Sequence, residues 1–360
     1  MTVLLVVAIL VVLIVAHELG HFIAAKIFRV RVDEFGIGYP PRAYLLGKIG
    51  ETEYTLNWIP FGGFVRLFGE DEERGHGSLA YAARWKQAII LVAGVTANVV
   101  MAYLLFVAAY TQGVPRIIDT PEPGVAAQLM VSDVVPGSPA DASGLIAGDQ
   151  IVDVQDQKNA HPTDSTPEAV TDFVRQRGGQ TIMLTYLRAH ATSTVSMKPA
   201  NAVVPGEAGR AALGIGLVLV STQSLPLGQS IDHAWITLGN GFIYVGGSLW
   251  HILSGFASGH ADLSQVVGPV GLVSVIGDAA QSGWGYVLEL AGFISINLAI
   301  VNMIPIPALD GGRLLVLGVE SITRRRSSRF AIQLLNTVGV ALIILLMVTV
   351  TYHDITRLFV

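Results

Sequence analysis

Residues 2–28, TVLLVVAILVVLIVAHELGHFIAAKIF, form an apolar run with the motif His-Glu-Leu-Gly-His at 17–21. About 20 helical residues cross the roughly 30 Å hydrocarbon core of a bilayer, so this run predicts a membrane span. In a helix, His17 and His21 lie one turn apart on the same face. They can share one zinc ion, and Glu18 can act as general base on a water molecule. The alternative is a pair of buried, hydrogen-bonded histidines, but polar groups are costly in a membrane span and indicate function.

The composition is that of an integral membrane protein, because 52% of the 360 residues are hydrophobic and 14% are charged. Soluble domains have about 25% charged residues. A net charge of −5 argues against a nucleic-acid partner. The absence of cysteine excludes disulfides, thiolate metal ligands and iron–sulfur clusters. The N-terminal run lacks the basic start and the cleavage site of a signal peptide, so we expect it to be retained.

Hydropathy and charge predict four membrane spans and their orientation. The spans are expected at about 2–28, 88–112, 286–304 and 331–352. Basic residues cluster between the first two spans and at 324–326, which places both of these loops in the cytoplasm and the N-terminus outside. A fifth apolar stretch at about 234–256 is rich in glycine. If this stretch also crossed the membrane, the basic residues 324–326 would lie outside, against the charge rule. We therefore expect an interfacial helix instead.

The loop between the first two spans predicts a β-hairpin over about residues 50–70. Residues 53–60 and 64–68 have strand character and flank Phe61-Gly62-Gly63. One interpretation is an ordinary cytoplasmic hairpin. The other is a re-entrant hairpin that dips toward the active site and offers an unpaired edge to an extended substrate.

A soluble insert occupies about residues 124–200, where strand patterns alternate with turns. The stretches at 136–140, 143–145 and 148–151, a helix near 166–177 and a strand near 181–187 resemble a PDZ domain of the kind associated with bacterial proteases. PDZ folds bind chain termini by strand addition. The alternative is a rigid spacer or size filter that binds no peptide.

The third span ends in a break that supplies a third metal ligand. Pro305 and Pro307 cannot continue a helix, and Asp310 follows with two glycines that allow close approach. This break and His17 lie at similar depths toward the cytoplasmic side, so Asp310 completes a His, His, carboxylate zinc site. Asp310 could instead cap a helix. The remaining histidines are expected to be solvated or structural, and they are His76, His161, His190, His233, His251, His260 and His353.

Together these residues resemble the site-2 protease family of intramembrane zinc metalloproteases, of the bacterial regulator-of-sigma-E type. The similarity rests on the HELGH motif, the Phe61-Gly62-Gly63 stretch, the PDZ-like insert, the sequence GPVG at 268–271 and NMIPIPALDG at 302–311. It implies zinc ligands at His17, His21 and Asp310 and a catalytic base at Glu18. The positions that it implies for substrate binding are Asn302, Phe61, Gly62, Gly63 and Asn98. Gly94-Val95 stands where the family often has Gly-Pro, so roles for Gly94 and Asn98 have weaker support.

The expected fold is a mainly α-helical polytopic membrane protein with four transmembrane helices, a membrane-associated β-hairpin and an inserted extracytoplasmic PDZ-like α+β domain. The predicted domains are an N-terminal membrane core, a PDZ-like domain, a connecting region with the interfacial helix, and a C-terminal membrane core, at 1–112, 113–205, 206–283 and 284–360.

The resemblance implies that the enzyme lies in the bacterial inner membrane, with its active site near the cytoplasmic side. It implies cleavage of single-span membrane proteins, such as anti-sigma factors or signal-peptide remnants, after a site-1-type protease has trimmed them. A catalytically inactive PDZ-bearing scaffold is the main alternative, although the intact Glu18 speaks against it. An ion transporter is a second alternative, but the sequence shows no internal repeat.

Overall fold

The structure, a computed structural model, describes residues 1–69, 77–120, 127–188, 191–201, 203, 209–258, 267–325 and 328–357. His76, His190, His260 and Arg326, for which locations are predicted above, lie outside these residues. The chain divides into two compact units. The first joins Met1–Gln112 to Leu225–Val360, and the second is Gly113–Ser224.

Four helices in the described part of the chain are long and apolar enough to cross a membrane, and they match the four predicted spans. They are α1 (Thr2–Ile27), α2 (Arg84–Gln112), α7 (Trp284–Met303) and α9 (Arg329–Arg357). Their lengths and compositions support a membrane protein with four spans.

Small residues and hydrogen bonds pack α2 between α1 and α7. Gly20 of α1 lies so close to α2 that a Cβ on it would be 2.3 Å from the Ala93 carbonyl oxygen. On the other side of α2, Ser295 of α7 donates a 2.8 Å hydrogen bond to the Asn98 carbonyl oxygen. In lipid, where the hydrophobic effect does not drive helices together, contacts of this kind stabilise their association. The backbone of α1 therefore lies directly against the middle of α2.

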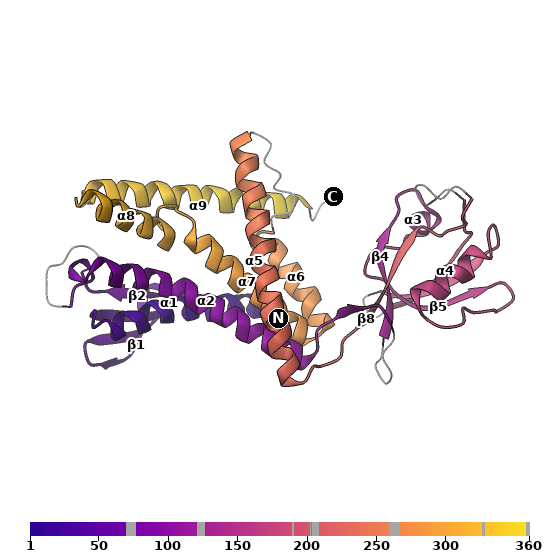
Figure 1. The fold of residues 1–360 in the computed structure, drawn as a ribbon, viewed down its shortest axis with the longest axis horizontal. Coiled ribbons are helices and arrows are strands. Elements are labelled where there is room, and N and C mark those ends of the chain that lie inside the picture. The colour runs from indigo at the N-terminus through magenta and orange to yellow at the C-terminus, as the bar shows by residue number, and fades with distance from the viewer. Residues whose placement is uncertain are drawn as a thin grey trace. The chain divides into compact units, whose positions relative to one another are not determined.

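One long helix, α5 (Leu227–Ser258), covers the stretch predicted as interfacial. It runs across the direction of α2 (Figure 1) and is anchored by a 2.6 Å hydrogen bond between Thr237 Oγ1 and Tyr110 Oη of α2. It is not among the four described helices that meet the length and hydropathy criteria for a span. Its placement in the membrane plane stays a prediction.

The GPVG sequence forms the start of α6 (Pro269–Ser282) and is held by the last helix. Asp354 of α9 is 4% exposed and accepts hydrogen bonds from the amides of Gly268 and Gly271 at 3.1 and 2.8 Å. Helix N-termini carry unpaired N–H groups and a partial positive charge, so a carboxylate stabilises them. This contact ties the C-terminal helix to α6.

The loop between α1 and α2 forms a sheet from two long strands, β1 (Val32–Ile49) and β2 (Thr52–Leu67). Residues 34–37 of β1 pair twice, with residues 53–56 and with residues 63–66 of β2. The remainder of β1, from Arg42, pairs with residues 52–57 across the turn at Gly50 and Glu51. We call residues 63–67 the edge segment, because no described strand pairs with its other side.

The predicted hairpin is therefore wrong in its pairing. Both predicted strands exist within β2, but they pair with the same residues of β1 rather than with each other. Phe61-Gly62-Gly63 is not a hairpin turn, because the chain there passes from one side of residues 34–37 to the other. The sequence obscured this arrangement because the central strand begins with Asp33 and Glu34, which are unfavourable in strands.

In its described residues, the second unit forms a six-stranded sheet of order β3-β8-β4-β5-β6-β7 with two short helices. In chain order its elements are β3 (Arg116–Ile118), β4 (Ala127–Val134), α3 (Pro139–Ala142), β5 (Gln150–Asp156), α4 (Pro167–Arg175), β6 (Ile182–Arg188), β7 (Ala191–Met197) and β8 (Ile215–Ser221). The helix and the strand expected near 166–177 and 181–187 are confirmed as α4 and β6. Since β8 pairs with both β3 and β4, this unit extends to Ser224, beyond the expected boundary at residue 205.

Two ion pairs stabilise this sheet unit. Asp149 is fully buried, and Arg188 contacts its two carboxylate oxygens at 2.6 and 2.7 Å. Burial opposes ionisation of Asp149, but the hydrogen bonds from Arg188 and from the Ile146 amide outweigh it and hold its pKa below the ordinary value. Asp156 accepts a 2.8 Å hydrogen bond from Arg177, which is the main reason that its pKa is lowered to about 2.

Candidate metal centre

Two of the predicted metal ligands lie on α1, as the sequence indicates. His17 and His21 are 7% and 6% exposed, and their Nε2 atoms are 3.2 Å apart. The spacing of four residues places both rings on the face of α1 that meets α2. The rings are thus packed within the protein and do not face lipid.

The third predicted ligand comes from a separate helix. After α7 the chain is non-helical through Pro305 and Pro307, and α8 (Asp310–Thr323) begins at Asp310 itself. The following glycines permit this tight return, because a Cβ on Gly311 would lie 2.3 Å from the carbonyl oxygen of Met303. The break that the prolines predict is confirmed, and it delivers the carboxylate to α1.

The three ligand atoms meet at distances that suit a bound zinc ion. Asp310 Oδ2 lies 3.0 Å from His17 Nε2 and 3.3 Å from His21 Nε2. Zinc bonds of about 2.0–2.1 Å in a tetrahedral arrangement place neighbouring ligand atoms about 3.3 Å apart. Among the described residues, these three form the group of histidine, aspartate or glutamate side chains that could hold a metal ion.

The hydrogen bonds around the rings also fit a metal. His21 Nδ1 lies 2.7 Å from the Ile90 carbonyl oxygen, so Nδ1 carries the proton and Nε2 presents a lone pair. Asp310 Oδ2, which faces that lone pair, is buried and accepts no hydrogen bond. Electron pairs on nitrogen and oxygen that face one another at this distance repel unless a cation lies between them. The donor set is that of a catalytic zinc site with an open fourth position.

The neighbouring helix α2 contributes a stripe of residues four apart along one face. Ile90 accepts from His21, and Asn98, with no exposed surface, lies with Nδ2 3.3 Å from His17 Nδ1. Asn98 Oδ1 is buried without a partner, so a half-turn of the terminal amide makes it the acceptor for His17 Nδ1–H. Between them, a Cβ on Gly94 would lie 2.3 Å from His21 Nε2. These α2 residues orient both rings.

Glu18 is positioned by the sheet. Its Oε2 accepts a 3.1 Å hydrogen bond from the backbone amide of Val65 in the edge segment. A Cβ on Gly63 would lie 3.7 Å from Glu18 Cγ, so the edge segment passes directly beside this carboxylate. The carboxylate that follows His17 in the sequence thus lies against an open strand edge.

The residues expected to bind substrate are only partly gathered at the site. Gly63 lies beside Glu18, and Gly62 lies one residue earlier, where a Cβ would meet Ile14 of α1 at 3.0 Å. Phe61 lies in β2, but its side chain is outside the described part of the structure. Asn98 is buried behind His17 instead of facing an open surface. Asn302 is half-buried in the last turn of α7, and no polar contact joins it to the site among the described residues.

Sequence reasoning missed the contacts that hold the His17, His21 and Glu18 side chains in place. The carbonyl of Ile90 and the amide of Val65 are backbone groups, so residue type carries no signal for them. Gly94 and Asn98 did carry one, since they stand four residues apart in a span, matching the spacing of His17 and His21. Two antiparallel helices with the same spacing of polar or small residues can be aligned on that basis.

Comparison with known proteins gives the family. The model of Peptidase family M50 matches residues 5–346. The Clostridium perfringens protein named "Putative zinc metalloprotease CPE1693" is 33% identical over 351 residues, 95% of each chain. "Zinc metalloprotease RasP" of Oceanobacillus iheyensis is 26% identical over an alignment 440 residues long, which covers 97% of this chain and 97% of that one.

Among solved structures, the PDZ domain of an SdrC-like protein from Listeria monocytogenes is similar at 21% identity and a TM-score of 0.21, over 28% of this chain and 93% of that one. The resemblance to site-2 proteases and the expected zinc cofactor are confirmed by the family model and by the named relatives. The chain belongs to Peptidase family M50 and is a zinc-dependent protease.

Proposed function

We propose that the protein hydrolyses a peptide bond within the membrane, with zinc bound by His17, His21 and Asp310 and with Glu18 as general base. The observation that carries this proposal is the meeting of three ligand atoms within 3.0–3.3 Å of one another beside Glu18. All four residues lie on or next to helices that are apolar enough to span a bilayer.

Zinc, when bound, supplies a Lewis acid that activates water and polarises the scissile carbonyl. The protein supplies the remaining chemistry. Glu18 accepts a proton from the attacking water and delivers it to the nitrogen of the leaving amide. The Val65 amide holds the Glu18 carboxylate in place, while the Ile90 carbonyl and Asn98 fix the two imidazole rings in the form that leaves Nε2 unprotonated.

The substrate class follows from the edge segment. A helical membrane span must be unwound before a protease can cut it, and an extended peptide can pair with an open strand edge through its backbone alone. Alternate residues of a strand point their N–H and C=O groups to the same edge, so Gly63 shares the Glu18 side with Val65. We therefore expect single-span membrane proteins as substrates, including anti-sigma factors and signal-peptide remnants, with Asn302 and Phe61 contributing contacts.

The proposal also covers where the enzyme lies and how its substrates are selected. Basic residues between α1 and α2 favour a cytoplasmic position for the β1–β2 sheet, in a bacterial inner membrane. The second unit then lies outside, as a PDZ-like domain that admits substrates already trimmed by a site-1-type protease. Deletion of this unit should allow untrimmed substrates to be cut, and unchanged selectivity would contradict the gating role.

The test is cleavage of a model single-span substrate by purified wild type and by Glu18→Gln in detergent, with and without a zinc chelator. Cleavage by wild type alone, lost on chelation and restored by zinc, supports the proposal. If both proteins bind zinc and neither cuts any of several trimmed substrates, a scaffold function is favoured instead. Equal cleavage by both would show that Glu18 is not the base.

A further inference from the structure

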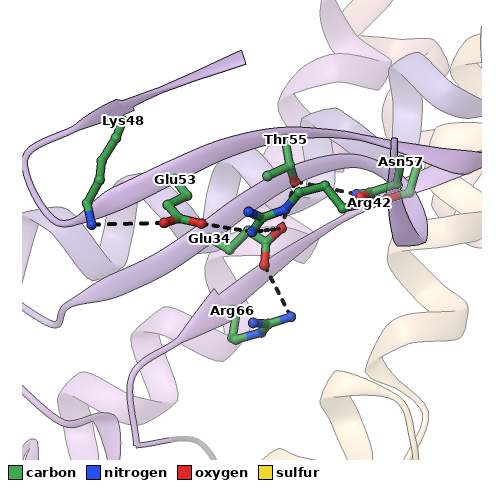
Figure 2. A network of polar contacts seen from close by, with 8 residues as sticks. Glu34, Arg42, Lys48, Glu53, Thr55, Asn57 and Arg66 are labelled. Carbon is green, nitrogen blue, oxygen red and sulfur yellow. Dashed lines mark hydrogen bonds and ion pairs between the residues drawn. The ribbon is translucent and has the colours of Figure 1, made fainter. Parts of the chain in front are cut away.

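Glu34 is a carboxylate in the middle of the β1–β2 sheet with only 5% of its surface exposed. Thr55 donates a 2.8 Å hydrogen bond to Glu34 Oε1, and Arg42 Nη2 lies 3.2 Å from the same oxygen. Arg66 Nη2 lies 3.2 Å from Oε2 (Figure 2). Burial of a carboxylate is tolerated because hydrogen bonds and opposite charges replace its hydration.

These partners lie on all the other segments of the sheet. Thr55 belongs to residues 52–57, Arg42 to the outer half of β1, and Arg66 to the edge segment. The network continues outward, since Arg42 also pairs with Glu53 at 2.8 Å, and Glu53 lies 3.9 Å from Lys48 (Figure 2). One buried carboxylate thus contacts each of the three segments arranged around residues 34–37.

The side-chain contacts of Glu34 select the same alignment as its backbone pairing. Arg66 is both the ladder partner of Glu34 and its ion-pair partner. Only the carboxylate of this ion pair is buried, since Arg66 is largely exposed, so the pair adds little net stability. It can still specify which residues lie opposite one another. Here the alignment matters, because a slip of one residue turns every N–H of a strand to the opposite edge.

The observed alignment of the edge segment is the one that directs the Val65 amide to Glu18. Val65 pairs with Phe35 and directs its amide away from the sheet, where it donates to Glu18 at 3.1 Å. After a slip by one residue, the Val65 amide would point toward β1 and leave Glu18 without this donor. The chain that passes from residue 57 to residue 63 contains Gly62 at a φ of +83°, a conformation that glycine adopts without strain.

We propose that Glu34 is a positioning residue, which fixes the register of the edge segment through Arg66 and thereby holds the Val65 amide on Glu18. This role rests on the proposed function of Glu18 as the catalytic base. Glu34 does not contact the metal centre. A shift in the register of the edge segment would therefore leave His17, His21 and Asp310 in place while it removes the Val65 amide from Glu18.

The test compares Glu34→Gln, Arg66→Gln and the double variant in the full-length protein, with Lys48→Gln as the matched control. Lys48 carries charge in the same network but touches Glu53 and not Glu34. We expect amide hydrogen exchange in residues 63–66 to accelerate about threefold in Arg66→Gln, whose side chain is largely exposed, and further in Glu34→Gln, at unchanged zinc content. Cleavage should fall about threefold in Arg66→Gln and further in Glu34→Gln, which also loses Arg42. The double variant should fall no further than Glu34→Gln, since that change already removes the contact with Arg66.

Glu34→Asp keeps the charge on a shorter side chain and should recover part of the activity. Arg66 is 57% exposed, so Arg66→Gln will fold even if Glu34→Gln does not. Unchanged exchange in residues 63–66 of Arg66→Gln, or effects of the two single changes that simply multiply, would overturn the proposal. If the wild type cuts no substrate, the proposed function fails, yet the exchange measurement still decides whether Glu34 fixes the edge segment.

Discussion

Replacing Gly94 with alanine tests whether the close approach of α2 to the two histidines is required for zinc binding. A Cβ at this position would lie 2.3 Å from His21 Nε2 and 2.8 Å from His17 Cε1. Ordinary contacts of a Cβ begin at 3.4 Å, so the rings or the helix must move by about 1 Å. The new methyl group would also lie almost as close to Nε2 as a zinc ion, whose bond to nitrogen is about 2.0–2.1 Å.

The size of the effect follows from the cost of overpacking. Extra methyl groups in a packed core cost about 1–3 kcal/mol. If His21 yields by leaving its position, this cost appears as weaker zinc binding, and each 1.4 kcal/mol corresponds to a factor of ten. We therefore expect Gly94→Ala to bind zinc about 5- to 150-fold more weakly than wild type and to lose cleavage at limiting zinc.

The assay is a competition titration with a chromophoric zinc chelator on purified protein in detergent, with metal analysis after dialysis. Gly292→Ala is the matched control, because its Cβ would lie 2.5 Å from Phe106 Cε1, at the other face of α2 and away from the ligands. That variant should lose thermal stability but keep its zinc affinity. Wild-type zinc affinity in Gly94→Ala, or an equal loss in Gly292→Ala, would refute the reasoning.

Three other predictions concern single polar contacts. Asp310→Asn replaces the charged ligand with a neutral amide, so zinc content after dialysis should fall while the four helices remain folded by circular dichroism. Arg188→Met leaves the buried Asp149 carboxylate without its arginine partner, which is itself 39% exposed, and this should destabilise the second unit by about 1–3 kcal/mol in denaturant unfolding. Asp156 has a folded-state pKa of about 2, below its ordinary value of 3.8, so its stabilising contribution is complete above pH 3.8 and lost as the pH falls toward 2. Asp156→Asn should remove this acid-dependent step, as followed by hydrogen exchange in the second unit.

The parts of the fold that could be predicted are those that residue type encodes locally. Uninterrupted apolar runs identify α1, α2, α7 and α9, since a bilayer requires about 20 apolar residues and internal backbone hydrogen bonding. The i, i+4 spacing identifies the two histidines as a pair. Pro305 and Pro307 predict the break before Asp310 because proline lacks an amide and clashes within a helix.

The parts that could not be predicted depend on pairing between distant segments. Strand character was visible in residues 53–60 and 64–68, but nothing local states that residues 34–37 lie between them. Glu34 is unfavourable in a strand when it is considered alone. Its burial is tolerated because Arg42, Arg66 and Thr55, on other segments of the sheet, contact its carboxylate. Strand propensity describes one residue at a time, whereas the stability of this sheet depends on contacts between residues of different segments.

The metal centre shows how a weak signal becomes strong once two helices are considered together. His17 and His21 on α1, and Gly94 and Asn98 on α2, each stand four residues apart, and the helices run in opposite directions. His21 accordingly meets the Ile90 end of the stripe and His17 meets Asn98, with the glycine in between. A larger residue at position 94 would separate the helices, and an apolar residue at position 98 would leave His17 Nδ1 without an oriented partner. The proposed zinc site therefore depends on a second helix that is small at one position and polar four residues later, and α2 belongs to the proposed site together with α1.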